Sequence, residues 1–302
     1  MKNFKGGTAV ITGAGSGFGL EASRIAAKLG MNVVMADVQR DALDKAVAEI
    51  KALGAHVLPF RLDVSKAAEV EALGAATLER FGAPNFVFNN AGVGAGGLIW
   101  ETSLKDWEWV VGVNLMGVAH GMRVFTPMML EAAAKDPAYE GHIVNTASMA
   151  GLLNPPCSSV YNATKAAVIA MSETLYHDLR LVTDQIGASV LCPYFVPTGI
   201  VHSDRNRAAD LANDSRPTKS QIIARAMSEK AVTSGKLTAA QVAQFVFDGV
   251  AEGNFYIYSH PHALGSVQVR LEDIMTGRNP SDPFAHKPEL GTALRAQLRT
   301  VD

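Results

Sequence analysis

T-G-A-G-S-G-F-G at residues 12–19 follows the short apolar run T-A-V-I at residues 8–11 and leads into a helix-like segment. The glycines at positions 13, 17 and 19 lack side chains, so they permit a tight turn and a close approach by a ligand. The start of the next helix presents free N–H groups and partial positive charge to a phosphate. The stretch predicts a strand, a turn and a helix around a dinucleotide pyrophosphate, with a glycine-rich turn that binds nothing as the alternative.

Strand-like and helix-like segments alternate along most of the chain. The helical spacing is clearest after the glycines and again in residues 43–53. Strand-like runs lie at residues 8–12, 32–36, 57–61, 86–88, 142–146 and 188–192, and a seventh at residues 255–258 follows the helical stretch 238–250. This alternation predicts an α/β fold: a doubly wound (Rossmann) parallel sheet of about seven strands with helices on both faces.

The length of 302 residues and the 48% hydrophobic composition favour one domain with a sizeable core. We expect this Rossmann-fold domain to cover residues 1–258. Residues 200–235 are polar and too long for a simple connection, so they predict a mobile lid over the strand ends, with a solvated surface insertion as the alternative. Residues 259–302 form an extension that we expect to pack on the same domain or on a neighbouring subunit.

The bulk composition limits the classes of partner. A formal net charge of −2, a pI near 6.5 and the lack of a long basic run give no reason to expect nucleic acid or an anionic membrane surface. The start of the chain lacks a signal-peptide pattern, and no run approaches the roughly 18 apolar residues that span a bilayer. Cys157 and Cys192 have no metal spacing and predict reduced thiols. We expect a cytoplasmic protein without a metal that acts on a small molecule.

Asp37 ends the second strand-like run about 20 residues after the glycines, where a carboxylate accepts hydrogen bonds from an adenosine ribose. A 2′-phosphate would meet like charge there, and Ser16 supplies no compensating charge, so NAD is favoured over NADP; Arg40 argues the other way. Asp63 is placed to accept from an adenine amino group or to cap the next helix. Because S-adenosylmethionine enzymes share such a turn and acidic residue, this half of the chain leaves the chemistry open.

Ser148, Tyr161 and Lys165 carry the chemistry of the second half. Ser148 follows a buried strand at the carboxyl edge of the sheet, where open α/β sheets bind ligands. Tyr161 and Lys165 are neighbours on one helical face. A phenol that works near neutrality needs its pKa of about 10 lowered by about 3 units, roughly 4 kcal/mol, and one ammonium at about 4 Å supplies that much. Taken alone, Y-x-x-x-K is equally explained by an ordinary surface Tyr with a solvated Lys. A methyltransferase, the other class considered, has no use for a Tyr and a Lys at this spacing.

Six ordered motifs resemble those of the short-chain dehydrogenase/reductase family over about residues 5–258. They are T-G-x-x-x-G-x-G, Leu62-Asp63-Val64, Asn89-Asn90-Ala91-Gly92, Val113-Asn114-Leu115, Ser148 and Tyr161-x-x-x-Lys165. The resemblance implies an NAD(P)-dependent oxidoreductase that interconverts a secondary alcohol and a ketone. A protein that keeps this fold and binds a nucleotide without turnover is the alternative, and the intact Ser148, Tyr161 and Lys165 argue against it.

The resemblance also implies a role for each matching position. Tyr161 is the expected general acid/base, Ser148 holds the substrate oxygen, Lys165 binds the nicotinamide ribose and lowers the pKa of the tyrosine, and Asn114 anchors a water. The expected cofactor site comprises Gly13, Ser16, Gly17, Phe18, Gly19, Asp37, Val38, Asp63, Val64, Asn90, Ala91, Gly92, Tyr161, Lys165, Pro193, Val196 and Thr198. Tyr194 departs from the glycine that usually follows Pro193, which places the approach of the backbone to the nicotinamide in question.

The expected substrate site lies among residues 94–98, residues 149–159 and the lid. Its apolar candidates favour a hydrophobic or aromatic alcohol or ketone, although a core role explains them equally: Leu152, Leu153, Pro155, Pro156, Tyr194 and Phe195. The stretches N-L-M-G-V at residue 114, K-A-A-V-I at residue 165 and F-Y-I-Y at residue 255 look like the aryl-alcohol (lignin β-aryl ether) Cα-dehydrogenase branch of the family.

Two helix-like stretches, residues 104–134 and 159–181, predict a homodimer or homotetramer. The first is apolar on more than one side, which indicates burial on both sides. Its apolar residues are Trp107, Val110, Val111, Leu115, Val118, Met122 and Phe125. The family resemblance implies association through the same two helices, with the two-fold symmetry usual for soluble homo-oligomers.

Overall fold

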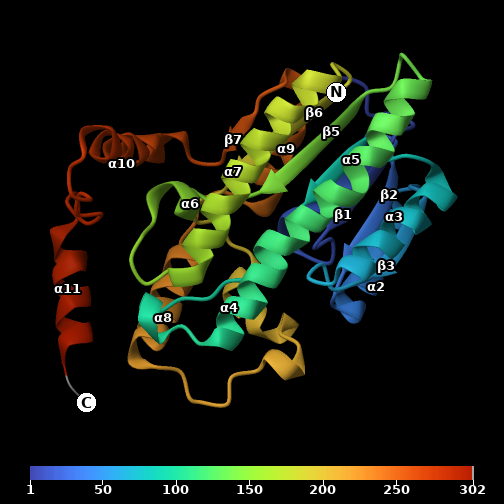
Figure 1. Cartoon of the computed structure of the whole chain (residues 1–302). Coiled ribbons are helices and arrows are strands. Elements are labelled where there is room, and N and C mark those ends of the chain that lie inside the picture. Colours follow the sequence, from blue (N-terminus) through green and yellow to red (C-terminus); the bar gives the residue numbers. More distant parts are fainter. Residues whose placement is uncertain (301–302) are drawn as a thin grey trace.

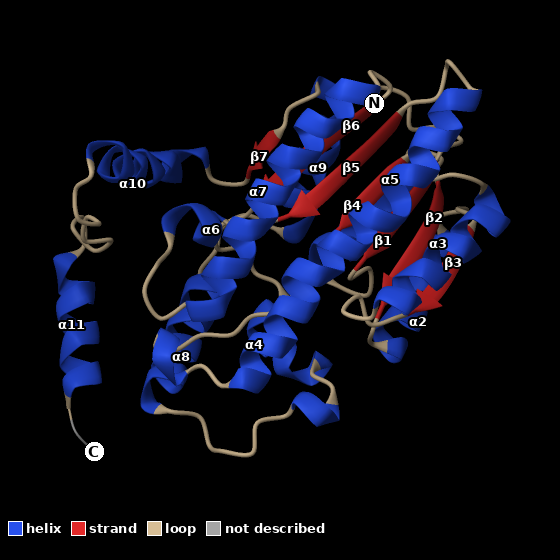
Figure 2. Ribbon diagram, in the orientation of Figure 1, coloured by secondary structure: helices blue, strands red, loops and turns tan. Residues whose placement is uncertain are grey.

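The computed structural model describes residues 1–300 and contains one seven-stranded parallel sheet in the order β3-β2-β1-β4-β5-β6-β7 (Figures 1 and 2). The strands are β1 (Thr8–Thr12), β2 (Asn32–Asp37), β3 (Val57–Arg61), β4 (Phe86–Asn89), β5 (Gly141–Thr146), β6 (Ile186–Cys192) and β7 (Tyr256–Tyr258). The strand order reverses between β1 and β4. The predicted doubly wound α/β fold is confirmed.

Helices cover both faces of the sheet because successive side chains of each strand point to opposite sides. Ala9 and Ile11 of β1 lie in one core, with α1 (Gly17–Lys28), α2 (Arg40–Ala52) and α9 (Ala239–Glu252). Val10 lies in the other core, with α3 (Ala67–Phe81), α5 (Gly117–Lys135) and α7 (Ser159–Val182). Both faces of β1 are therefore buried in apolar cores. Burial on both faces explains why such strands appear in the sequence as nearly continuous apolar runs.

The strand ends differ from the predicted ones by one or two residues. β2 extends to Asp37, β4 to Asn89, and β5 and β6 begin at Gly141 and Ile186. β7 is shorter than predicted and begins at Tyr256, because Phe255 joins the ladder only through its carbonyl, which accepts from Val190. Polar or small residues therefore take part in the hydrogen bonds of the sheet at strand ends, where the apolar pattern of the sequence does not mark them.

Residues 200–235 are not an unstructured connection. They contain most of the 3₁₀ segment η3 (Gly199–Asn206), a second 3₁₀ turn, η4 (Ala209–Leu211), and the four-turn helix α8 (Lys219–Thr233). Thr218 starts α8 through a reciprocal capping box with Gln221. The predicted lid therefore carries its own local structure, and its mobility remains a prediction.

A π-helical turn, η2 (Gly112–Met116), joins α4 (Leu104–Val111) to α5 in one continuous helical stretch. Such turns add one residue to the helical register and are frequent at functional sites. The turn contains the fully buried Asn114. The change of register at this turn therefore directs the Asn114 side chain into the protein interior.

The chain after β7 forms η5 (Pro261–Ala263), α10 (Leu264–Thr276) and α11 (Pro288–Arg299). α10 touches the short helix α6 (Met149–Leu153), and both C-terminal helices stand away from the sheet (Figure 1). The packing expected for this extension in an assembly remains a prediction.

The described residues 1–300 include no helix long and apolar enough to cross a membrane. Over the same range, no cluster of three or more His, Cys, Asp or Glu side chains is arranged to hold a metal ion. Both cysteines are free, with Cys192 buried at the end of β6.

His142 makes the stability of the fold depend on pH. Its Nε2 lies 2.7 Å from the Ser189 hydroxyl, which donates to the carbonyl of Asn254, so Nε2 carries a proton and the imidazole is neutral. Burial lowers the pKa of His142 to about 3. In the unfolded chain the imidazole takes up its second proton near pH 6.5, whereas in the folded chain it does so only near pH 3. Acidification between these two pH values therefore favours unfolding.

We expect the free energy of unfolding to fall by about 2 kcal/mol from this group alone between pH 7.5 and pH 5. Urea unfolding of the wild type and of His142→Gln at both pH values measures the effect. In the variant, the free energy of unfolding should change less between the two pH values. An equal change in both proteins would contradict the assignment to His142.

Candidate active site

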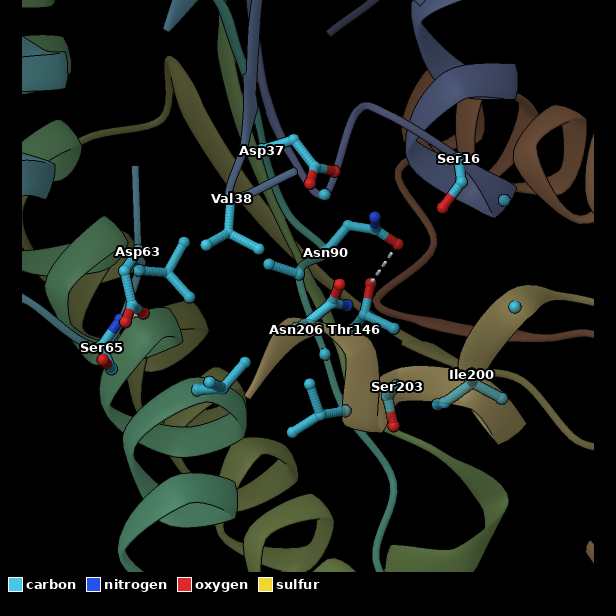
Figure 3. A pocket seen from close by; sticks show the side chains of 18 of the residues that line it. Ser16, Asp37, Val38, Asp63, Ser65, Asn90, Thr146, Ile200, Ser203 and Asn206 are labelled. Atoms are coloured by element: carbon cyan, nitrogen blue, oxygen red, sulfur yellow. Dashed lines mark hydrogen bonds between the residues drawn. The ribbon is translucent and has the colours of Figure 1, made fainter. Parts of the chain in front are cut away.

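The site lies in the crevice at the carboxyl ends of β1 and β4, where the strand order reverses. Asn90, directly after β4, donates from its backbone N–H to the Thr12 hydroxyl and from its amide to the Thr12 carbonyl, both at 2.9 Å. Thr146 at the end of β5 donates to the Asn90 amide oxygen at 3.5 Å (Figure 3). These bonds hold the ends of three neighbouring strands together at the pocket floor, the usual ligand position in such sheets.

Most of the residues predicted for the cofactor site line this pocket. They are Gly13, Ser16, Gly17, Phe18, Asp37, Val38, Asp63, Val64, Asn90, Ala91, Gly92, Tyr161, Lys165, Pro193 and Thr198. Gly19, Asn114, Ser148 and Val196 do not line it. Val196 is 3% exposed and belongs to the hydrophobic core, so it supports the pocket wall from behind.

The glycine turn has the geometry that a pyrophosphate requires. Gly13 and Gly17 have φ values of 66° and 54°, a region that glycine adopts readily. A Cβ on Gly19 would overlap the carbonyl oxygen of Gly13, so glycine there lets α1 begin directly against the turn. The N-cap Ser16 makes no side-chain hydrogen bond, and the first N–H groups of α1 have no intrahelical partner.

Asp37 and Asp63 occupy the other end of the pocket (Figure 3). The Asp37 carboxylate accepts from the backbone N–H of Gly15 and of Gln39, both at 2.9 Å, so it also holds the glycine turn. Asp63 accepts from Ser65 at 2.9 Å, whereas Lys66 is the N-cap of α3. The helix-cap alternative for Asp63 was therefore wrong, since its carboxylate forms a local turn beside the pocket.

Tyr161 and Lys165 line the pocket as well, and Ser148 lies next to Tyr161. Ser148 is the N-cap of α6; its hydroxyl accepts from Ala150 at 3.1 Å and lies 3.3 Å from the Pro193 carbonyl. Lys165 is 2% exposed and donates to the Thr146 carbonyl at 2.7 Å, with its Nζ 5.7 Å from the centre of the Tyr161 ring. α7 begins at Ser159, the first residue of the predicted stretch 159–181, so Tyr161 lies in its first turn.

The electrostatics of this trio follow from burial. Burial raises the pKa of Tyr161, and a hydrogen bond from Ser148 opposes that shift. Burial also lowers the pKa of Lys165 to about 8. The predicted lowering of the tyrosine pKa by Lys165 stays a prediction.

Asn114 fastens the helix to the loop after β4. Its amide donates to the Val93 carbonyl at 2.9 Å and its oxygen accepts from the Val93 N–H at 2.8 Å. Both polar ends of the side chain therefore have protein partners. Its predicted role as a water anchor is untested.

Tyr194 points away from the pocket. Its backbone N–H donates to Ser259 at 2.9 Å, and its ring lies 4.3 Å from that of Phe195 and 5.9 Å from that of His260, centre to centre. Pro193 itself still lines the pocket. An aromatic residue in place of the usual glycine is thus accommodated on the β7 side, outside the cofactor wall.

The three segments predicted to surround the substrate contact one another. Gly97 donates to the Cys157 carbonyl and Leu98 to the Ser220 hydroxyl, both at 2.9 Å. Leu152 and Leu153 instead pack against a core cluster shared with α10, so the core explanation holds for these two.

Several pocket residues were absent from the sequence prediction. Thr146 could have been found as the last residue of the strand before Ser148. Val113 stands in the motif around Asn114. Other lining residues come from α4 and from the insertion, and no motif marks them: Glu108, Trp109, Ile200, Ser203, Arg205, Asn206, Ala208 and Leu211.

Comparison with known proteins gives a consistent result. Residues 7–209 match the family model described as short chain dehydrogenase. The chain is 32% identical over 283 residues to the CLA biosynthesis dehydrogenase/reductase of Lactiplantibacillus plantarum, covering 93% of this chain and 97% of that protein. It is 32% identical over 293 residues to the C alpha-dehydrogenase of Sphingobium sp. (strain NBRC 103272 / SYK-6), covering 94% and 90%.

A solved structure is more similar still. The short chain dehydrogenase/reductase from Burkholderia phymatum in complex with NAD shares 53% identity and a TM-score of 0.91, covering 94% of this chain and 99% of that chain.

The glycine turn gives a matched pair of substitutions. We expect Gly19→Ala to destabilise the protein by about 1–3 kcal/mol, because the new methyl group must displace the Gly13 carbonyl. Gly265→Ala in α10 meets open space and should be neutral or stabilising by about 0.5–1 kcal/mol. Thermal unfolding of both variants measures the difference, and equal stability would show that the turn tolerates a side chain.

Proposed function

The chain belongs to the short-chain dehydrogenase/reductase family, and from that premise we propose that it interconverts a secondary alcohol and a ketone with NAD as its preferred cofactor. The proposal rests chiefly on one observation. Tyr161 and Lys165 line the same pocket as the glycine turn and Asp37, and Ser148 lies next to Tyr161. A dinucleotide has the two-ended shape that this arrangement suits.

The residues present fit the cofactor. The open N–H groups of α1 suit the pyrophosphate, and a Cβ on Gly92 would lie 3.7 Å from the Lys165 ammonium, so the small residue keeps that end of the pocket open. The nicotinamide, when bound, supplies the centre that gains or loses hydride.

Tyr161 moves the proton in this proposal. During alcohol oxidation its phenolate accepts the hydroxyl proton, and during ketone reduction its phenol returns it. Ser148 donates to the substrate oxygen in this proposal; without substrate its hydroxyl donates to the Pro193 carbonyl at 3.3 Å. Lys165, held by the Thr146 carbonyl, directs an ammonium toward the ribose hydroxyls and stabilises the phenolate form of Tyr161.

The proposed substrate class is a hydrophobic or aromatic alcohol or ketone. The support is the similarity to the Sphingobium C alpha-dehydrogenase, because Leu152 and Leu153 pack against the core and do not add to it. A turnover screen of aliphatic and aryl secondary alcohols and their ketones, with NAD(H) and NADP(H), tests the proposed function directly.

We expect Tyr161→Phe to lower kcat/KM by about 10²- to 10⁴-fold, because only the ionisable hydroxyl is removed. NADH binding, followed by fluorescence titration, should stay within a few-fold of the wild type. Turnover at the wild-type rate would remove Tyr161 from the chemistry, and NADH binding by a wild type without any turnover would favour a binding protein.

We expect a higher kcat/KM with NAD than with NADP, because the Asp37 carboxylate would repel a 2′-phosphate and the exposed Arg40 lies outside the pocket lining. Asp37→Ser should shift the ratio toward NADP by about tenfold or more, the equivalent of about 1.4 kcal/mol. Gln39→Ser is the neighbouring control and should leave the preference for NAD in place. A wild type that prefers NADP would contradict the role of Asp37.

We also propose a homodimer or homotetramer built on α4, α5 and α7. Val110, Val118 and Phe125 are buried within the subunit, which accounts for part of the apolar surplus, whereas Met116 and Leu181 are 40% and 83% exposed. Light scattering at micromolar concentration should give a multiple of the 32.0 kDa chain mass. A clean monomer mass would refute the assembly.

A further inference from the structure

Residues 199–214, here called the strap, cross the mouth of the cofactor pocket. Seven of them line it: Gly199, Ile200, Ser203, Arg205, Asn206, Ala208 and Leu211. The strap begins beside the glycine turn, since a Cβ on Gly17 would lie 3.7 Å from the Thr198 side chain. It therefore forms a wall opposite the sheet, over the same pocket that holds Asp37 and Tyr161.

Polar contacts hold the strap at two points along the pocket. At the Asp37 end, the Gln39 amide donates to the Arg205 carbonyl at 3.0 Å. Near the middle, the Ser203 hydroxyl accepts from Gly94 at 2.9 Å. These contacts join the strap to the loops after β2 and β4, so a dinucleotide of the proposed kind cannot leave the pocket sideways without breaking them.

The strongest tie is the ion pair between Arg207 and Asp106 at the start of α4. Their side chains are only 11% and 7% exposed, and the guanidinium lies 4.3 Å over the Trp109 ring. Burial alone would raise the pKa of Asp106, but hydrogen bonds from Arg207, Asn213 and Ser103 lower it. The carboxylate is therefore charged, and the pair is a desolvated, directional contact rather than a surface one.

Two neighbouring strap residues hold buried polar atoms without a partner. Among residues 1–300, neither Asn206 Oδ1 nor Arg207 Nε has a hydrogen bond within the protein. Asn206 lines the pocket, and its amide is directed from the strap toward the side on which Asn90 and Thr146 lie (Figure 3). A buried amide is costly to leave unpaired, and a dinucleotide offers hydroxyl and amide groups that would pair with it.

We propose that residues 199–214 close over the bound dinucleotide, with the Arg207–Asp106 ion pair as the latch and the Asn206 side-chain amide as the strap's contact with the cofactor. This inference rests on the proposed function. Arg207 is then a positioning residue, because it acts on the cofactor through the strap and the adjacent Asn206. Release of the cofactor requires the latch to open.

The test measures NADH release and strap opening separately. Stopped-flow displacement of NADH by excess NAD should show release at least about tenfold faster from Arg207→Ala than from the wild type. Hydrogen–deuterium exchange in the cofactor-free protein should rise in peptides covering residues 199–214. Because Arg207→Ala leaves the Asp106 charge buried, the double variant Arg207→Ala/Asp106→Ala repeats both measurements without that unpaired charge.

Arg225→Ala is the matched control. Its guanidinium also pairs with the strap, 3.5 Å from Asp204, but both side chains are more than half exposed, so the pair is weak. NADH release from this variant should match the wild type. Asn206→Ala should weaken NADH binding without raising exchange in the strap, and the exposed Asp210→Ala should change neither.

The outcomes separate this inference from the proposed function. A wild type that does not bind NADH would contradict the proposed function itself. A wild type that binds NADH, with unchanged release and unchanged strap exchange in both Arg207 variants, would overturn the latch alone. Wild-type NADH affinity in Asn206→Ala would remove the assigned contact.

Discussion

The pairing of β1 with β2 on one side and β4 on the other is the constraint on which the rest depends. All strands are parallel, so each needs a crossover, and the crossovers from β1 and β4 leave in opposite directions. The carboxyl ends of these two strands are consequently left without a covering helix. The glycine turn, Asn90 and the start of α1 surround this crevice, which is why the pocket forms here.

Lys165 shows how the fold sustains a chemically demanding site. Its ammonium is almost fully buried and rests on a backbone carbonyl rather than on a carboxylate, an arrangement that costs several kcal/mol in desolvation. The rigid ends of β5 and α7 hold it in place beside Tyr161. A purely structural lysine would gain more from reaching solvent, so the burial is best explained by the ligand end of the pocket.

The insertion after β6 contributes to the site as much as the sheet does. Its α8 closes residues 94–98 over the catalytic end through Ser220, while the strap covers the cofactor end through Arg207 and Asp106. Both contacts use side chains of the insertion that meet loops at the carboxyl edge of the sheet. One segment therefore contacts both the loop after β4 and the start of α4.

The sequence by itself determined the sheet and the crevice and predicted the principal chemistry, because these depend on local signals. Apolar periodicity marks strands and helices, the glycine spacing marks the turn, and the four-residue spacing of Tyr161 and Lys165 places both on one face of α7. Only the tertiary structure decided that Val196 is core, that Tyr194 turns outward and that the strap closes on α4. Arg207 and Asp106 are 101 residues apart and belong to no local pattern. Their contact arises from the packing of two distant segments, which no spacing in the chain encodes.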